Sequence, residues 1–224
     1  MNVRLISYSK PPEEIYVGEN IQELIAYCAR VSNPSNQDNA ETSERLLRYL
    51  IREKHWSPFE MVSACLEVTT TRDIARQLLR HRSFSFQEFS QRYADPTKDL
   101  NFHLKDTRLQ DTKNRQNSIE NDDATLQLEW LQQQAEVVNV AKKAYGWAIE
   151  KGIAKEQARA VLPEGIMDSR LYVNGTIRSW IHYVDLRSGN GTQKEHIEVA
   201  QQCALALKPI FPMIMEFCHG ADKL

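Results

Sequence analysis

One segment, Arg80–Tyr93, constrains the fold of this chain more than any other and reads RHRSFSFQEFSQRY. It holds three arginines, one histidine, three serines and one glutamate, with neither Gly nor Pro. Polar groups this crowded need partners, because burying them unpaired is costly. Guanidinium groups bind phosphate through paired N–H donors, and serine hydroxyls bond the remaining oxygens. The segment therefore predicts a fold that presents it to an anionic ligand.

The spacing inside this segment resembles the signature RHRxxSxxxxSxR of the flavin-dependent thymidylate synthases. A match at six fixed offsets is a specific signal, unlike a short glycine motif. The alternative is a basic surface strand that binds phosphate without specificity. The six matching positions are Arg80, His81, Arg82, Ser85, Ser90 and Arg92.

Three further stretches are similar to segments of the same family. His55–Glu60 reads HWSPFE and resembles H-x-[ST]-x-x-[EH], while Ala158–Pro163 reads ARAVLP and Gly175–Arg187 reads GTIRSWIHYVDLR. The resemblance thus extends from the first predicted helix to about Gln193. A histidine such as His182 can equally be a structural residue. The chain departs from the family, where Asn is frequent, at Gln87, Thr176 and His182.

The resemblance implies reductive methylation of dUMP to dTMP. It implies 5,10-methylenetetrahydrofolate as the carbon donor, NADPH as the reductant and FAD as the hydride carrier, with the protein positioning and polarising the reactants. It also implies a homotetramer whose active sites are built between subunits. No metal is expected.

The resemblance also assigns roles to individual residues. Arg187 would stabilise negative charge on the pyrimidine, Ser90 would hydrogen-bond the nucleotide, and His55 would lie where folate and flavin meet. The expected dUMP contacts are Gln77, Arg80, Glu88, Ser90, Gln91, Arg92, Arg159 and Arg187. The expected FAD contacts are His55, Ser57, Glu60, Arg80, His81, Arg82, Ser83, Gln87, Glu88, Thr176, Arg178 and His182.

Local patterns add expectations that are independent of the family. Ser57 as N-cap, with Glu60 three residues later, predicts a capping box, whose outward N–H groups suit an anion. Arg72 and Arg76 share a helix face, which is expected to be either solvated or salt-bridged. Glu88 fits a salt bridge to Arg82 or Arg92 even within a binding site.

Composition argues against two other functions. The net charge of −2 disfavours a nucleic-acid-binding module that uses 80–93, although Phe84, Phe86, Phe89 and Tyr93 could stack on bases. An NAD- or metal-dependent enzyme is disfavoured because neither a glycine fingerprint nor His/Cys ligand spacing is found. No partner nucleic acid is therefore expected.

The cysteines and the N-terminus predict a cytoplasmic protein. Cys28, Cys65, Cys203 and Cys218 show no CxxC spacing, which predicts neither a zinc site nor disulfides. None is close in sequence to the arginine-rich segment, so no cysteine nucleophile is expected. No run is long and apolar enough to span a bilayer, and no signal peptide is recognised.

Hydrophobic periodicity predicts a mixture of strands and helices. The predicted strands are 2–8, 61–70 and 169–173, and 95–121 is predicted to be a long polar excursion without assigned chemistry. The predicted helices are 20–31, 41–54, 71–80, 123–152, 155–162, 176–186, 192–207 and a final apolar helix from Pro209 through Cys218. The pattern lacks the βαβ alternation of a nucleotide-binding Rossmann fold. We therefore expect one α+β domain over 1–224, with an antiparallel-rich sheet flanked by long helices.

Overall fold

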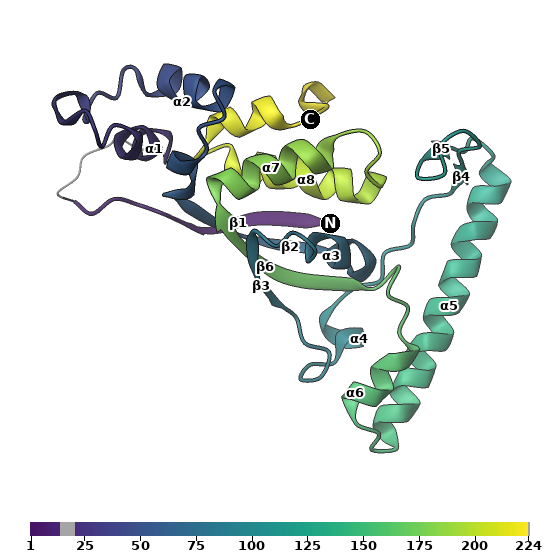
Figure 1. The fold of residues 1–224 in the computed structure, drawn as a ribbon. Coiled ribbons are helices and arrows are strands. Elements are labelled where there is room, and N and C mark those ends of the chain that lie inside the picture. Colours follow the sequence, from purple (N-terminus) through teal and green to yellow (C-terminus); the bar gives the residue numbers. More distant parts are fainter. Residues whose placement is uncertain (14–20, 224) are drawn as a thin grey trace.

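A four-stranded antiparallel sheet with strand order β1-β2-β6-β3 forms the centre of the protein (Figure 1). The structure is a computed structural model that describes residues 1–13 and 21–223. In this strand order β6, the last strand in the chain, lies between the earlier strands β2 and β3. The strands are β1 (Asn2–Tyr8), β2 (Ser63–Thr71), β3 (Phe84–Glu88) and β6 (Asp168–Thr176).

The sheet has one buried face and one polar face. On β6 the buried Leu171 and Val173 alternate with the exposed Arg170, Tyr172 and Asn174. This alternation follows from the strand geometry, since successive side chains point to opposite faces. The fold thus presents the exposed side chains of β3 and β6 on a shared surface.

Helices cover the apolar face of the sheet (Figure 1). The main pair is α7 (Ile177–Ser188) and α8 (Lys194–Leu207), and α1 (Ile21–Ala29) and α2 (Ser43–Arg52) pack beside it. Trp180 of α7 is fully buried, and its indole Nε1 donates to the Ala64 carbonyl oxygen at 3.0 Å. Burial of these apolar side chains is the main stabilising term for the layer.

A short helix, α3 (Arg72–Leu78), connects β2 to the arginine-rich segment. Its buried residues Ile74, Ala75 and Leu78 anchor it on the core. The two ends of α3 therefore place polar residues at two different parts of the surface.

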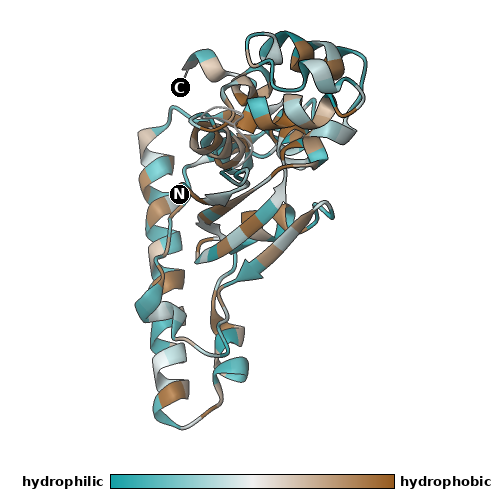
Figure 2. Cartoon of the chain, turned by 90° about the vertical axis from the view of Figure 1, so that its left-hand side faces the viewer, coloured by the Kyte–Doolittle hydropathy of each residue, from teal (hydrophilic) through white to brown (hydrophobic). Residues whose placement is uncertain are grey.

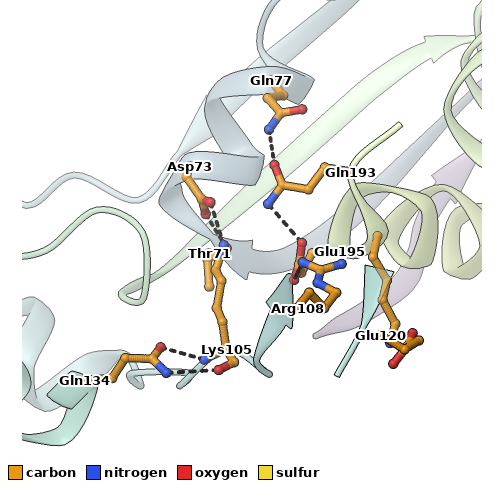
Figure 3. Close-up of polar contacts among 10 residues, drawn as sticks. Thr71, Asp73, Gln77, Lys105, Arg108, Glu120, Gln134, Gln193 and Glu195 are labelled. Atoms are coloured by element: carbon orange, nitrogen blue, oxygen red, sulfur yellow. Dashed lines mark hydrogen bonds and ion pairs between the residues drawn. The ribbon is translucent and has the colours of Figure 1, made fainter. Parts of the chain in front are cut away.

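The predicted polar excursion is ordered rather than unstructured. It contains α4 (Pro96–Asp99) and a hairpin of β4 (Arg108–Gln110) and β5 (Ser118–Glu120). Lys105 forms an ion pair with Asp73 of α3, and its backbone bonds the Gln134 amide (Figure 3). Long-range pairs of this kind leave no periodic trace in a sequence, which is why the excursion looked featureless.

The long helix α5 (Ala124–Glu150) stands to one side of the sheet (Figure 1). The Asp123 side chain caps its start, and Gly152, at φ 75°, follows its end. Hydrophobic residues recur along this helix in Figure 2. A second apolar cluster joins α5 to the short helix α6 (Lys155–Ala158) through Tyr145, Ala148 and Met167.

The predicted α+β fold with an antiparallel sheet and flanking helices is confirmed, with three local corrections. The final apolar helix is instead a 3-10 helix over Pro212–Phe217, and β6 extends beyond 169–173. The capping box is also wrong, because the 3-10 helix Ser57–Glu60 has no side-chain cap. Two predicted positions, Glu14 at the break after β1 and Asn20 at a helix start, lie outside the described residues. Within the described residues, no helix is long and apolar enough to cross a membrane.

Candidate active site

The three residues Arg80–Arg82, here called the RHR turn, lie between α3 and β3. Backbone bonds hold the turn, with the His81 N–H donating to Leu78 and the Phe84 N–H to His81. The Arg80 and Arg82 side chains are exposed, and among residues 1–13 and 21–223 neither has a hydrogen-bond or ion-pair partner. Two unpaired cations two residues apart in one turn favour binding of an anion here.

His81 differs from its two neighbours because it is half-buried and bonded. The Arg187 Nε donates to His81 Nε2 at 2.9 Å. Burial, and then the positive charge of Arg187, lower the pKa of His81 to about 4. The imidazole is therefore neutral near pH 7, accepts on Nε2, and orients the Arg187 guanidinium.

A chain of hydrogen bonds, here called the amide relay, runs from Tyr183 through His196, Gln77 and Gln193 to Glu195. Gln77 Nε2 donates to Gln193 Oε1 at 2.9 Å, and Gln193 Nε2 donates to Glu195 Oε2 at 2.9 Å (Figure 3). His196 Nδ1 lies 3.2 Å from Gln77 Oε1, and His196 Nε2 lies 3.1 Å from the Tyr183 hydroxyl. The relay joins α3 to the start of α8 and fixes the Gln77 side chain.

The sequence analysis assigned no role to four members of the relay, Tyr183, Gln193, Glu195 and His196. One signal was present, since His196 falls on the buried face of α8 among apolar residues such as Val199 and Cys203. A histidine on an apolar face needs a polar partner. The partner, Gln77, is far away in sequence and could not be identified from spacing.

A second group of predicted residues lies where the chain leaves β3, near α6. Arg92 forms an ion pair with Glu156 at 3.3 Å. Arg159 lines a pocket together with Glu156 and Gln91, and it has no ion pair among the described residues. Gln91 is buried, and its Nε2 lies 3.2 Å from the Met167 sulfur. The Ser90 Oγ accepts the Arg92 N–H at 3.4 Å.

Glu88 has a different partner from those expected. It accepts a hydrogen bond from Ser169 Oγ at 2.7 Å and lies 3.5 Å from Arg72, so the predicted pairing with Arg82 or Arg92 is wrong. The separation of Glu88 from Arg82 follows from the length of β3, because Arg82 lies two residues before the strand and Glu88 is its last residue. The helix face of Arg72 and Arg76 is salt-bridged, and both arginines pair with Glu164.

A third group surrounds the 3-10 helix Ser57–Glu60 and α7. The Glu60 carboxylate accepts from Arg178 at 2.7 Å instead of capping its own helix. His182 packs edge-on against Trp56, with ring centroids 4.8 Å apart. Burial, followed by the charge of Arg178, lowers the pKa of His182, which leaves a neutral ring. His55 and Ser57 are exposed beside this group.

Two other predicted flavin contacts bond within the motif region. Thr176 caps α7 by accepting the Ser179 N–H at 3.2 Å, and Ser179 Oγ donates to the Ser83 carbonyl at 3.2 Å. Gly175 is required here, since a Cβ at this position would lie 2.3 Å from Phe84 Cδ1. The RHR turn, β3 and the start of α7 are thus held together.

The polar face of β3 carries Ser85 and Gln87, which pair across the sheet with Asn174 and Tyr172. The phenylalanines point the other way, and Phe84 stacks on Trp180 with ring centroids 4.5 Å apart. A buried ring cannot stack on a base, so Phe84 does not support the nucleic-acid-binding alternative. Tyr93 is 81% exposed and is not part of this packing.

The predicted residues therefore form three groups: the RHR turn with the relay, the Ser90–Arg92 region, and the region around Glu60. Among the described residues, no side-chain hydrogen bond or ion pair joins one group to another. No cluster of three or more His, Cys, Asp or Glu that could hold a metal is found in that part of the chain. Exposed Arg, Ser and Gln donors, two of the arginines without acidic partners, suit an anionic cofactor such as FAD by their chemistry.

The family model and the curated relatives that match this chain agree on one family. A family model described as thymidylate synthase complementing protein matches residues 13–213. A flavin-dependent thymidylate synthase of Synechocystis is 50% identical over 213 residues, covering 94% of each chain. A probable flavin-dependent thymidylate synthase of Paramecium bursaria Chlorella virus 1 is 49% identical over 215 residues, covering 96% of this chain and 97% of the relative.

A solved structure shares the fold along most of the chain. It is a UMP/dUMP methylase, PolB, from Streptomyces cacaoi, bound with 5-Br dUMP. The TM-score is 0.79 at 26% sequence identity, and the match covers 96% of this chain and 93% of PolB.

Proposed function

Because the chain belongs to the thymidylate synthase complementing protein family, we propose that it is a flavin-dependent thymidylate synthase that methylates dUMP reductively. Methylenetetrahydrofolate supplies the one-carbon unit and NADPH supplies two electrons. With one proton taken up from solvent, the products are dTMP, tetrahydrofolate and NADP⁺, which balances atoms and electrons. One observation carries this proposal, the pair of unpaired arginines in a turn that also places His81 against Arg187.

The nucleotide phosphate and base are bound by two of the groups. Arg80, Arg92 and Arg159 supply charge-assisted donors to the phosphate. To bind the phosphate, Arg92 must release its ion pair with Glu156. The loss of this pair costs little, since exposed ion pairs contribute only about 0–1 kcal/mol. The remaining contacts come from Gln77, Glu88, Ser90, Gln91 and Arg187.

Arg187 stabilises negative charge that develops on the pyrimidine oxygens. Its Nε is committed to His81, so its terminal nitrogens remain for the substrate. A neutral His81 can hold this guanidinium without adding a second positive charge. Donors preorganised in this way lower the transition-state energy because they need no reorientation during the reaction.

The cofactor FAD carries hydride between NADPH and the pyrimidine when it is bound. Arg80, Arg82, Ser83 and Gln87 would donate to its polar groups from the RHR turn and β3. The Glu60–Arg178 pair and His182 would border it on the α7 side, and His55 would lie between flavin and folate. The full set is His55, Ser57, Glu60, Arg80, His81, Arg82, Ser83, Gln87, Glu88, Thr176, Arg178 and His182.

No cysteine acts as a nucleophile in this proposal. Burial raises the pKa of Cys28, Cys65, Cys203 and Cys218, which suppresses the thiolate that a nucleophile requires. Ser90 also lacks an adjacent general base among the described residues. All four cysteines are free, and the cytoplasmic location stays a prediction.

We also propose that 1–224 is one domain and that four copies form a homotetramer with shared sites. One side of α5 supports this, because apolar residues recur there at spacings of three and four and stay exposed. Exposed apolar stripes of this size mark interaction surfaces. The stripe, here called the α5 seam, comprises the exposed Leu126, Trp130, Val137, Val140 and Trp147, and the polar Gln133 and half-buried Ala144 complete the spacing of three and four.

The direct test is turnover by the purified protein. We expect a flavin absorption spectrum after incubation with FAD, and dTMP formation that requires dUMP, methylenetetrahydrofolate and NADPH together. Omission of each component in turn gives the controls. Oxidation of NADPH by the flavin-loaded protein without any dTMP would contradict the proposal.

A further inference from the structure

The amide relay has a fixed direction, because one of its ends can only accept. Glu195 accepts from Gln193 Nε2 and from Arg108 Nη2. Burial raises the pKa of Glu195, but hydrogen bonds, led by the one from Arg108, outweigh it and leave the pKa below its usual value. The group is therefore a carboxylate at neutral pH, which has acceptors and no donor.

This carboxylate determines the orientation of each amide in turn. The Gln193 amide must turn its NH₂ group toward Glu195, so its oxygen faces Gln77. Gln77 must then donate through Nε2, which leaves its oxygen facing His196 Nδ1 at 3.2 Å. One Gln77 N–H is used by Gln193, and the second hydrogen on the same nitrogen is available to a ligand.

The far end of the relay agrees with this direction. His196 has to donate from Nδ1 and accept on Nε2, which requires a neutral ring. Burial, and then the charge of Arg187, lower the pKa of His196 to about 3. The Tyr183 hydroxyl, whose pKa burial raises, stays protonated and donates to Nε2. Every link thus has one donor and one acceptor.

Arg108 belongs to the β4–β5 hairpin, to which the sequence analysis assigned no chemistry. Its side chain and that of Glu195 are 13% and 15% exposed, so this pair is largely shielded from solvent (Figure 3). Arg108 is connected to Gln77 through Glu195 and Gln193. A hairpin outside the recognised motifs is thereby connected to a predicted substrate residue.

We propose that Glu195 and Arg108 are positioning residues that orient the Gln77 amide so that it offers an N–H donor to a pyrimidine carbonyl oxygen of dUMP. This rests on the proposed function, in which Gln77 contacts dUMP. Neither residue touches the substrate. Their effect on dUMP binding passes through the two glutamine amides.

The test compares Glu195→Gln with Glu120→Gln. Glu120 pairs with Lys194 at 3.2 Å and connects the same hairpin to α8 without touching the relay. An amide at position 195 can donate as well as accept, so the direction of the relay is lost. We expect dUMP to bind about tenfold more weakly to Glu195→Gln, and within about twofold of the parent for Glu120→Gln.

A double-mutant cycle separates positioning from general damage. In a Gln77→Ala background, Glu195→Gln should change the dUMP dissociation constant by less than about twofold, because residues in one network are not additive. Arg108→Lys should retain tighter dUMP binding than Arg108→Met. In both variants KM should change more than kcat. Equal losses in both backgrounds, an equal loss from Glu120→Gln, or normal dUMP binding by Gln77→Ala would overturn the proposal.

A measurement on the ligand-free protein keeps this test separate from the proposed function. ¹⁵N imidazole NMR should show His196 as the Nδ1–H tautomer in the parent and as a mixture in Glu195→Gln. A parent that shows the Nε2–H tautomer overturns the relay. Failure of the parent to make dTMP counts against the proposed function instead, and the tautomer still decides the relay.

Discussion

The amide relay and the RHR turn lie close together at the end of α3, but they treat their polar groups in opposite ways. In the relay each link pairs one donor with one acceptor, and both His196 and Tyr183 are fully or almost fully buried. In the turn, Arg80 and Arg82 are exposed without a partner in the described part of the chain. Matched bonds fix orientation, whereas unmatched cations leave binding energy for a ligand. Mutations in the two regions should therefore have different consequences.

The largest effect is expected from breaking the matched region. His196→Ala removes a buried ring and leaves the Tyr183 hydroxyl and the Gln77 oxygen unpaired. We expect the free energy of unfolding to fall by about 3 kcal/mol, measured by urea denaturation. His219→Ala, which removes a mostly exposed ring, is the control and should stay within about 0.5 kcal/mol. Equal stability of both variants would show that the relay is not structural.

Removing an unmatched cation should affect binding and spare the fold. Arg80→Ala is expected to weaken dUMP binding by about 2 kcal/mol, a factor of about 30, because charge-assisted hydrogen bonds are lost. Its unfolding free energy should change by less than about 0.5 kcal/mol. Arg45→Ala, another exposed arginine on α2, is the control for titration and stability. An unchanged dUMP titration curve for Arg80→Ala would contradict the assignment.

Acid should weaken the matched region. The pKa of His81 is lowered to about 4 and that of His196 to about 3, so between these values and about 6.5 the unfolded chain binds more protons than the folded one. Stability contributed by the neutral rings is present above pH 6.5 and is lost as the pH falls. For His196 the loss by pH 4 is on the order of 3 kcal/mol. The stability difference between the parent and His196→Ala should therefore narrow from pH 7 to pH 4, and a constant difference would refute this linkage.

The α5 seam resembles the RHR turn in that its side chains are exposed, but these side chains are apolar rather than charged. Val140 is 68% exposed, so Val140→Ser should change the stability of a protomer by less than about 0.5 kcal/mol. We expect it to lower the fraction of assembled protein instead, measured by light scattering after size-exclusion chromatography. Lys143→Ser, outside the seam on the same helix, is the control. If Val140→Ser and Trp147→Ser both assemble like the parent, the seam is not an interface.

Periodic patterns predicted much of the fold. The alternation in β2 and the helical spacing in α5 were visible in the sequence, because each depends on neighbours within a few residues. These features come from local geometry and need no knowledge of the tertiary structure.

Contacts between distant residues could not be predicted in this way. Glu60 resembled a cap, yet its carboxylate bonds Arg178, which lies 118 residues away. Arg108 and Glu195 are 87 residues apart, and neither belongs to a recognised motif. A charged side chain has several possible partners of opposite sign, and the fold alone selects among them.

The strand order has a consequence for how the chain folds during synthesis. Within residues 1–13 and 21–223, the strand β3 pairs in the sheet with β6 alone. Since β6 begins at Asp168, β3 leaves the ribosome long before its neighbour exists. An unpaired edge strand is prone to associate with other chains. The segment that carries the RHR motif is therefore the part of the nascent protein that depends most on late synthesis, or on a chaperone, to stay soluble.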